Sequence, residues 1–146
     1  MRHTVHILMA DDDADDRLLA KSAFEENNIV NPIHFVEDGV ELMDYLHGIG
    51  KYNENRHLPG LILLDLNMPK KDGREALFEI KTDPFLKSIP VVILTTSKAE
   101  EDIIRAYNLG ANCFISKPVS FDGLLEVTRC LSKFWLEVAS IPGSED

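Results

Sequence analysis

Short apolar runs alternate along the chain with segments in which apolar side chains recur every three or four residues. The apolar runs predict five strands, at residues 5–10, 33–36, 61–64, 91–94 and 113–115. The helical periodicity predicts a helix after each strand, at about residues 13–27, 40–46, 76–80, 103–109 and 124–138. Residues 48–60 are rich in Gly, Asn and charge, contain Pro59, and are expected to form a loop.

The predicted strands at 61–64 and 91–94 are apolar throughout, without the alternation of a half-buried strand. Both faces of the sheet should therefore be covered, which is typical of parallel strands with helices on either side. We expect an α/β fold with a doubly wound, five-stranded parallel sheet. The 146 residues fit one domain, with a core over about 5–136, a C-terminal tail over 137–146 and no output domain.

The charge balance restricts the classes of partner. Lys and Arg total 15 against 25 Asp and Glu, a formal net charge of −10. Such a domain repels polyphosphate and anionic lipid, so nucleic acid and membranes are not expected partners. Two cysteines, Cys113 and Cys130, have no spacing typical of a disulfide framework or metal site. With no signal-peptide pattern at the N-terminus, a cytoplasmic location is expected.

Polar residues stand at or close to the ends of four of the predicted strands. Asp11 and Asp12 follow the first strand, Asp65 the third, Thr95 the fourth and Lys117 the fifth. In open parallel sheets, ligands bind beyond the carboxyl ends of the strands. These carboxylates, hydroxyl and ammonium should therefore converge at one edge of the sheet.

Charge repulsion at this edge points to a metal ion. Two carboxylates 4 Å apart repel by about 4 kcal/mol at an effective dielectric constant near 20. One lysine does not compensate three acids, whereas Mg²⁺ favours carboxylates together with waters and a substrate phosphate. The set predicts phosphoryl chemistry, in which a metal and Lys117 neutralise the transferred group and a carboxylate receives it.

The set formed by Asp11-Asp12, Asp65, Thr95 and Lys117-Pro118 strongly resembles the receiver domain of two-component response regulators, from about Val5 to Leu136. The segments LDLNMPKKDG, PVVILTTS and GANCFISKPV resemble stand-alone receivers associated with phytochrome-type histidine kinases. The resemblance implies a flavodoxin-like (βα)₅ fold. It also implies a single-domain response regulator that serves as a phosphorylation-controlled switch.

The resemblance assigns a role to each acid. Asp65 would accept a phosphoryl group from a phosphohistidine of a sensor histidine kinase. Asp12 and Asp65 would bind Mg²⁺ directly, together with the backbone carbonyl of Asn67. Asp11 would bind the ion through water.

The resemblance also implies how the switch works. Lys117 would pair with Asp65 and then with the phosphoryl oxygens, and Thr95 would move to hydrogen-bond one of them. Phe114 stands at the position of the family's switch aromatic and would turn inward when Thr95 moves. The Lys117-Pro118 peptide would be cis, as in the family.

The resemblance implies partners beyond the kinase. A phosphotransfer protein or a separate downstream target would read the phosphorylated state. The surface formed by the fourth helix, fifth strand and fifth helix is the family's usual signalling and dimerisation face. Ile103, Tyr107, Phe114 and Trp135 are expected on or near it, and a homodimer through it is a hypothesis.

Several residues have simpler interpretations. Asp13, Asp15 and Asp16 are expected to be solvated or to cap a helix, with Asp13 the N-cap. Cys113 and Cys130 are expected to be small core residues. Phe134 and Trp135 are expected to pack within the final helix. The five histidines show no clustering in the sequence, and none is expected to act as a phosphodonor or a ligand. They are His3, His6, His34, His47 and His57.

Two other functions remain open from the sequence. An aspartyl-phosphate phosphotransferase or phosphatase also places an Asp nucleophile at a strand end, but it normally has a second Asp two residues later, where this chain has Asn67. Its nucleophile also usually follows the first strand, whereas Asp65 follows the third. A phosphate-independent pseudo-receiver scaffold would be indicated by loss of an acid, the lysine or the acceptor, and all are present.

Overall fold

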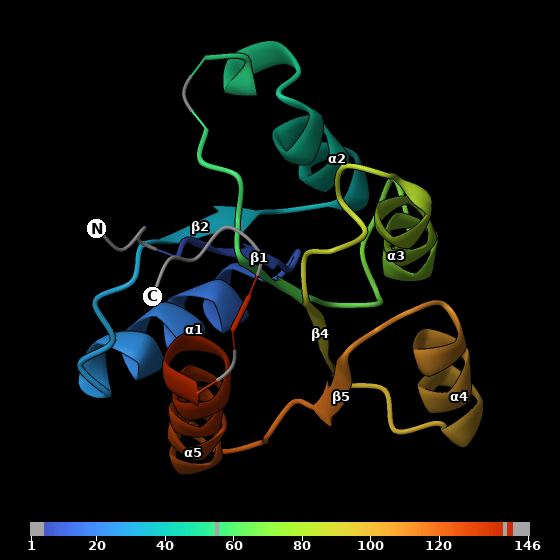
Figure 1. Ribbon diagram of the computed structural model, residues 1–146. Helices are drawn as coiled ribbons and strands as arrows, with labels where there is room; N and C mark the ends of the chain where they lie inside the picture. Colours follow the sequence, from blue (N-terminus) through green and yellow to red (C-terminus); the bar gives the residue numbers. More distant parts are fainter. Residues whose placement is uncertain (1–4, 55, 139, 142–146) are drawn as a thin grey trace.

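A parallel five-stranded sheet forms the centre of the computed structural model, which describes residues 5–54, 56–138, 140 and 141 (Figure 1). All pairings are parallel, and the strands lie in the order β2-β1-β3-β4-β5. The strand bounds are β1 Ile7–Ala10, β2 Ile33–Val36, β3 Leu61–Leu64, β4 Val91–Thr95 and β5 Cys113–Ser116. The expected doubly wound α/β fold is confirmed. The first strand begins at Ile7 rather than at Val5, and the fourth runs one residue further, to Thr95.

Five helices cover the sheet on both faces. Their bounds are α1 Ala14–Glu26, α2 Gly39–His47, α3 Gly73–Thr82, α4 Glu100–Asn108 and α5 Phe121–Leu131. Helices α1 and α5 lie together on one face, and α2, α3 and α4 lie on the other (Figure 1). Among the described residues, no helix is long and apolar enough to cross a bilayer.

Alternate residues of the same strands fill two separate cores. In β1, Leu8 packs with α2, α3 and α4, whereas Ile7 and Met9 pack with α1 and α5. Successive side chains of a strand point to opposite faces, so a strand buried on both sides has no polar position. This explains why β1, β3 and β4 read as continuous apolar runs.

Short polar side chains fix where the helices begin. The Asp13 carboxylate accepts hydrogen bonds from the backbone N–H groups of Asp15 and Asp16, which confirms Asp13 as the N-cap of α1. Asp38, Asp72 and Ser120 cap α2, α3 and α5 in the same way. These caps satisfy donors that have no partner inside the helix, and all four lie in segments that follow a strand at the carboxyl edge of the sheet.

The C-terminal part of the chain departs from the expected single helix. After Leu131, the backbone continues as a π-helical segment, Ser132–Val138. Trp135 packs against the α1–α5 core as expected, whereas Phe134 is 53% exposed. Within the predicted tail, Ile141 is buried beside Gly60.

The two cysteines have different environments. Cys113 packs against the core as expected. Cys130 is exposed, so the prediction of a core residue was wrong there. It lies on the outer face of α5, with its sulfur 3.7 Å from a carboxylate oxygen of Glu126.

Candidate functional site

Backbone pairing brings the predicted site residues together at the carboxyl edge of the sheet. The Asp65 N–H donates to the Ala10 carbonyl (3.0 Å), which places Asp65 beside the end of β1. The Lys117 N–H donates to the Thr95 carbonyl (2.7 Å), which places Lys117 beside the end of β4. The sheet therefore delivers residues from distant parts of the chain to one site without any long loop.

Asp65 is 6% exposed, and both of its carboxylate oxygens are held by donors. Its Oδ1 accepts hydrogen bonds from Thr95 Oγ1 (2.8 Å) and from the backbone N–H of Asn67 (3.1 Å). Its Oδ2 accepts from Lys117 Nζ (2.9 Å). These contacts fix the orientation of the carboxylate in a site almost closed to solvent.

Lys117 is surrounded by three carboxylates. Its Nζ lies 2.6 Å from Asp11 Oδ2, 2.8 Å from Asp16 Oδ2 and 2.9 Å from Asp65 Oδ2. Burial alone would lower the pKa of Lys117, but the hydrogen bonds that its ammonium donates to these carboxylates outweigh burial and raise the pKa above its usual value. Lys117 is therefore a fixed positive charge at the centre of the site.

Asp16 belongs to the site, so its prediction as a merely solvated or capping residue was wrong. The side chain lies in the first turn of α1 and reaches back to Lys117. The spacing of the acids gave no signal for this contact, because Asp12 precedes the N-cap Asp13 and shares no helix face with Asp16. Sequence reasoning grouped it with the N-terminal acids of the helix instead.

Asp11 is fully buried, so its ionised carboxylate is without hydration by solvent. Its Oδ1 accepts from the backbone N–H of Asp13 (2.9 Å), and Arg17 Nη1 donates to its carbonyl (2.8 Å). Burial raises the pKa of the Asp11 carboxyl, and the hydrogen bonds from Lys117 and Asp13 only partly oppose this. A further cation at Asp11 would therefore relieve an existing electrostatic cost.

The acids of the site form a donor set suited to a divalent cation. One carboxylate oxygen from each of Asp11, Asp12 and Asp65 lies within 4.8 Å of the others. Asp12 is exposed, whereas the other two are buried, so the cluster opens to solvent on one side. Hard oxygen donors with room for water ligands match what Mg²⁺ requires.

The backbone after β3 is packed against the start of α3. A Cβ atom at Gly73 would lie 2.2 Å from the Asp65 carbonyl oxygen and 2.6 Å from Leu66 Cα. The Gly73 N–H donates to the Leu66 carbonyl (2.9 Å). Only glycine permits this approach, so close backbone packing fixes the position of Asp65 relative to the start of α3.

The two residues predicted to form the switch lie on neighbouring strands. Thr95 ends β4 and is fully buried, with its hydroxyl on Asp65. Phe114 lies in β5 and is half-buried against the α2–α4 core, while its backbone N–H donates to Tyr107 Oη (3.1 Å). Their predicted roles, and that of the Asn67 carbonyl, stay predictions.

Two further expectations were wrong. The described chain contains no cis peptide bond, so Lys117-Pro118 is trans. A trans X–Pro bond is favoured by about 0.5–1 kcal/mol, and Lys117 reaches its three carboxylates in that form.

The histidines do cluster: His6, His34 and His57 stack at the opposite end of the sheet. The sequence does not reveal this cluster, because the contact between the rings depends on the register of the strands.

Comparison with known proteins agrees with this geometry. Residues 7–129 match the response regulator receiver domain family. Response regulator Rcp1 from Synechocystis sp. (strain ATCC 27184 / PCC 6803 / Kazusa) is 42% identical over 138 residues, which cover 94% of this chain and 93% of that protein.

Solved structures give the same relationship. The phosphorylated cyanobacterial phytochrome response regulator RcpA has a TM-score of 0.91 at 42% identity, covering 97% of this chain and 100% of that one. The Mn²⁺-bound form of response regulator Rcp1 has a TM-score of 0.88 at 42% identity, covering 95% and 99%. With its strand order, acid cluster and lysine in place, the chain belongs to the response regulator receiver domain family of two-component signalling.

Proposed function

We propose that Asp65 accepts a phosphoryl group from a phosphohistidine of a sensor histidine kinase, and that this modification switches a protein-interaction surface. The observation that carries the proposal is the environment of Asp65. One oxygen of its carboxylate is held by Thr95 and the Asn67 N–H, and the other by Lys117. The nucleophile is therefore oriented and paired with a cation before the phosphodonor arrives.

The transfer exchanges one bond for another. A carboxylate oxygen of Asp65 forms a bond to phosphorus as the bond between phosphorus and the imidazole nitrogen breaks, and the imidazole keeps the electron pair. Lys117, 2.9 Å from Asp65 Oδ2, lies where it can donate to an oxygen of the arriving phosphoryl group. Thr95 can donate to another once its hydroxyl leaves Asp65.

A divalent cation fits beside these residues. Asp11, Asp12 and Asp65 would hold it, with the carbonyl of Asn67 as a further ligand and Asp11 acting through water. When bound, such an ion neutralises charge on the transferred group. Asp11 gains most from the ion, because burial already disfavours its charged form.

An apolar surface next to Lys117 supports docking of the kinase. A pocket there is lined by Leu19 and Ala20 of α1 and by residues 118–121 and Leu124. Leu18 is 63% exposed, and Val119 is fully exposed. Exposed apolar side chains that border a reactive site indicate a protein partner, and the similarity to phytochrome response regulators supports a kinase of the phytochrome type as that partner.

Phosphorylation would act on the Thr95 and Phe114 region. It adds nearly two negative charges and new acceptor oxygens. A shift from a 1:99 to a 99:1 balance needs about 5.5 kcal/mol of differential interaction. Two new charge-assisted hydrogen bonds, each worth about 1.5–3 kcal/mol, supply most of this.

The surface that changes would be the one formed by α4, β5 and α5. Tyr107, on α4, is 48% exposed, and it hydrogen-bonds to the backbone of Phe114. A homodimer through this surface, a phosphotransfer protein and a separate target are the candidate readers. Gel filtration with and without beryllofluoride tests the dimer, and an unchanged monomer would contradict it.

We infer a signalling role rather than turnover of small phosphate esters. Asn67 stands where an aspartyl-phosphate phosphatase would have its acid, and an amide side chain does not donate a proton to a leaving group as a carboxylic acid does. Sustained release of phosphate from small esters would contradict this inference.

The decisive experiment is phosphotransfer from a phosphorylated sensor kinase, or from a small-molecule phosphodonor, in the presence of Mg²⁺. We expect one phosphoryl group per chain, detected by intact mass and mapped to Asp65, and complete loss of labelling in Asp65→Asn. Asp122→Asn is a matched control, because Asp122 is exposed on α5 and should leave labelling unchanged. Labelling of Asp65→Asn at the wild-type rate would overturn the proposal.

A further inference from the structure

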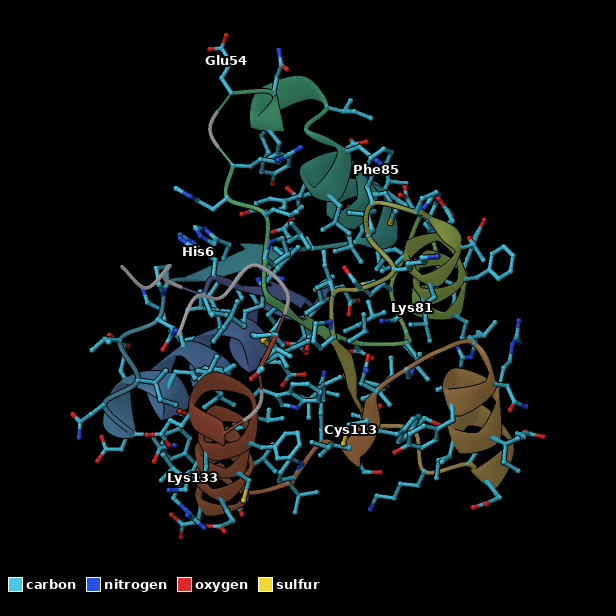
Figure 2. The ribbon with its side chains drawn as sticks, viewed as in Figure 1. His6, Glu54, Lys81, Phe85, Cys113 and Lys133 are labelled. Carbon is cyan, nitrogen blue, oxygen red and sulfur yellow. The ribbon has the colours of Figure 1, made fainter. Side chains whose placement is uncertain are left out.

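Three histidines from distant parts of the chain meet at the amino end of the sheet. His6 directly precedes β1, His34 lies in β2, and His57 lies in the loop before β3. Figure 2 shows His6 beside β2. His34 pairs with Leu8 in the strand register, so His6 and His34 project from the same face of the sheet.

The rings are in direct contact. His6 Nδ1 and His34 Nε2 are 3.0 Å apart, so one nitrogen donates a proton and the other accepts it. The His57 ring stacks on His6 with a centroid distance of 4.2 Å and an interplanar angle of 12°. His57 lies 6.3 Å from His34 by the same measure. Three imidazoles therefore share one small region of the surface.

We propose that His6, His34 and His57 form a second cation site, which binds a divalent transition metal such as Zn²⁺. This proposal does not depend on phosphorylation of Asp65. It concerns the opposite end of the sheet from the acid cluster and a different class of ion.

The nitrogen pair already has nearly the spacing of two metal ligands. Around a tetrahedral Zn²⁺ with Zn–N bonds of 2.0–2.1 Å, two ligand nitrogens are about 3.3 Å apart. The observed 3.0 Å between His6 Nδ1 and His34 Nε2 needs only a small widening. Two neutral imidazoles carry one N–H proton each, and one of these protons lies between the two facing nitrogens. When the donor ring moves that proton to its other nitrogen, both facing nitrogens are free to bind a metal, and no proton is lost.

His57 can complete the set by turning its ring. The ring now lies parallel to His6, so its nitrogens point past the shared position. The side chain is exposed, and rotation about its own side-chain bonds meets solvent. Its backbone stays in place, because the Tyr45 hydroxyl donates to the His57 carbonyl (3.0 Å).

The surroundings favour the neutral imidazoles that bind metals. Burial, followed by repulsion from His57, lowers the pKa of both His6 and His34, and repulsion from His34 adds to this at His6. Within the described part of the chain, no carboxylate is hydrogen-bonded to any of the three rings. The net charge of −10 attracts cations, and imidazole donors select Zn²⁺ or Co²⁺ over Mg²⁺.

Cobalt titration tests the site directly. All proteins carry His3→Gln and no affinity tag, so the remaining histidines are His6, His34, His47 and His57. Excess Mg²⁺ occupies the acid cluster, Co²⁺ is added, and the visible absorption typical of four-coordinate cobalt is followed. We expect saturation at one Co²⁺ per chain and displacement by Zn²⁺.

The variants separate the two ends of the sheet. His34→Gln and His57→Gln should each weaken binding by more than the roughly tenfold typical of losing an outer-shell partner. His47→Gln is the matched control, because His47 ends α2 and faces Asp83 at 3.9 Å. His57 is exposed, so its variant stays informative even if His34→Gln fails to fold.

Two results would overturn the proposal. One is the absence of a saturable cobalt signal in the protein with all three histidines. The other is a signal that survives both His34→Gln and His57→Gln but disappears in Asp65→Asn, which would place the ion in the acid cluster. Labelling of Asp65 in His34→Gln should be unchanged, so failure of the metal site and failure of the phosphoacceptor are distinguishable.

Discussion

At the carboxyl end of the sheet, a lysine holds three carboxylates, whereas at the amino end three imidazoles lie against one another. In the first group, Asp11 and Asp65 are buried, and each carboxylate oxygen of Asp65 is fixed by a donor. The second is half-buried to exposed, and burial lowers the pKa of His6 and His34. The difference shows that one sheet can separate hard oxygen donors from imidazole donors, so that each end prefers a different cation.

The largest effect is expected from removing the cation of the carboxyl end. Lys117→Met leaves Asp11, Asp16 and Asp65 without their shared partner, so the free energy of unfolding should fall by about 3 kcal/mol without Mg²⁺. Urea denaturation measures this. Lys98→Met is the control, because Lys98 is exposed and should change little. An equal loss in both variants would mean that the carboxyl end is not held by Lys117.

A second experiment asks whether magnesium stabilises the same end. At ten times its Kd, Mg²⁺ should raise the stability of the wild type by about 1.4 kcal/mol. In Asp11→Asn this gain should be much smaller, while stability without Mg²⁺ should rise. Thermal unfolding with and without Mg²⁺ measures both.

The direction of the Asp11→Asn effect follows from its pKa. Burial raises the pKa of Asp11 in the folded protein, so the folded state keeps a proton that the unfolded state loses. Stability therefore falls as pH rises from the unfolded pKa to the raised pKa, and the full cost is present above the raised pKa. Asn removes the charge and with it the cost. A less stable Asp11→Asn would show that the hydrogen bonds of Asp11 outweigh its desolvation.

A third, smaller effect is expected at the hydroxyl on Asp65. Thr95→Val removes the 2.8 Å hydrogen bond to Oδ1 and should lower the free energy of unfolding by about 1 kcal/mol. It should also reduce the difference between the unphosphorylated and phosphorylated proteins in gel filtration or amide exchange. The neighbouring Thr96 is exposed, so Thr96→Val should match the wild type in both measurements.

The smallest effect is expected at the amino end. The pKa values of His6 and His34 are lowered from 6.5, first by burial, so below about pH 6.5 the unfolded state binds protons that the folded state does not. The contribution of these histidines to the free energy of unfolding is fully present above this pH. It falls as the pH drops towards their lowered pKa values in the folded protein. The loss should be under about 1 kcal/mol, because solvent screens partly exposed groups.

Urea denaturation between pH 7.5 and 5.5, in steps of about half a unit, measures this loss. His34→Gln should flatten the curve, and His47→Gln should not. If His34→Gln changed nothing, the histidine cluster would be a packing contact without electrostatic consequence. The two ends of the sheet would then differ in charge alone.

Most of the carboxyl end could be predicted from the sequence. Asp65 and Lys117 each follow a short apolar strand, and the ends of parallel strands meet at one edge. This rule needs no knowledge of which strand lies beside which. The rule on strand ends did not predict the role of Asp16, because its contact with Lys117 depends on the direction of a side chain in the first turn of α1.

The amino end could not be predicted in the same way. His6 and His34 meet only because β1 pairs with β2 in the register that sets Leu8 opposite His34. His57 joins them through the path of the loop before β3, which the hydrogen bond from Tyr45 stabilises. No local pattern encodes such a meeting, so three isolated histidines gave no signal.

The close approach of Gly73 to the Asp65 carbonyl also provides a fixed reference frame for experiments. Because no side chain fits between them, α3 and the end of β3 should move as one rigid piece. Phe78 of α3 and Ile104 of α4 are both about half exposed, at 53% and 52%, and can carry spin labels. A changed separation between those labels on activation would then report displacement of α4 alone, since the α3 label stays with the acceptor.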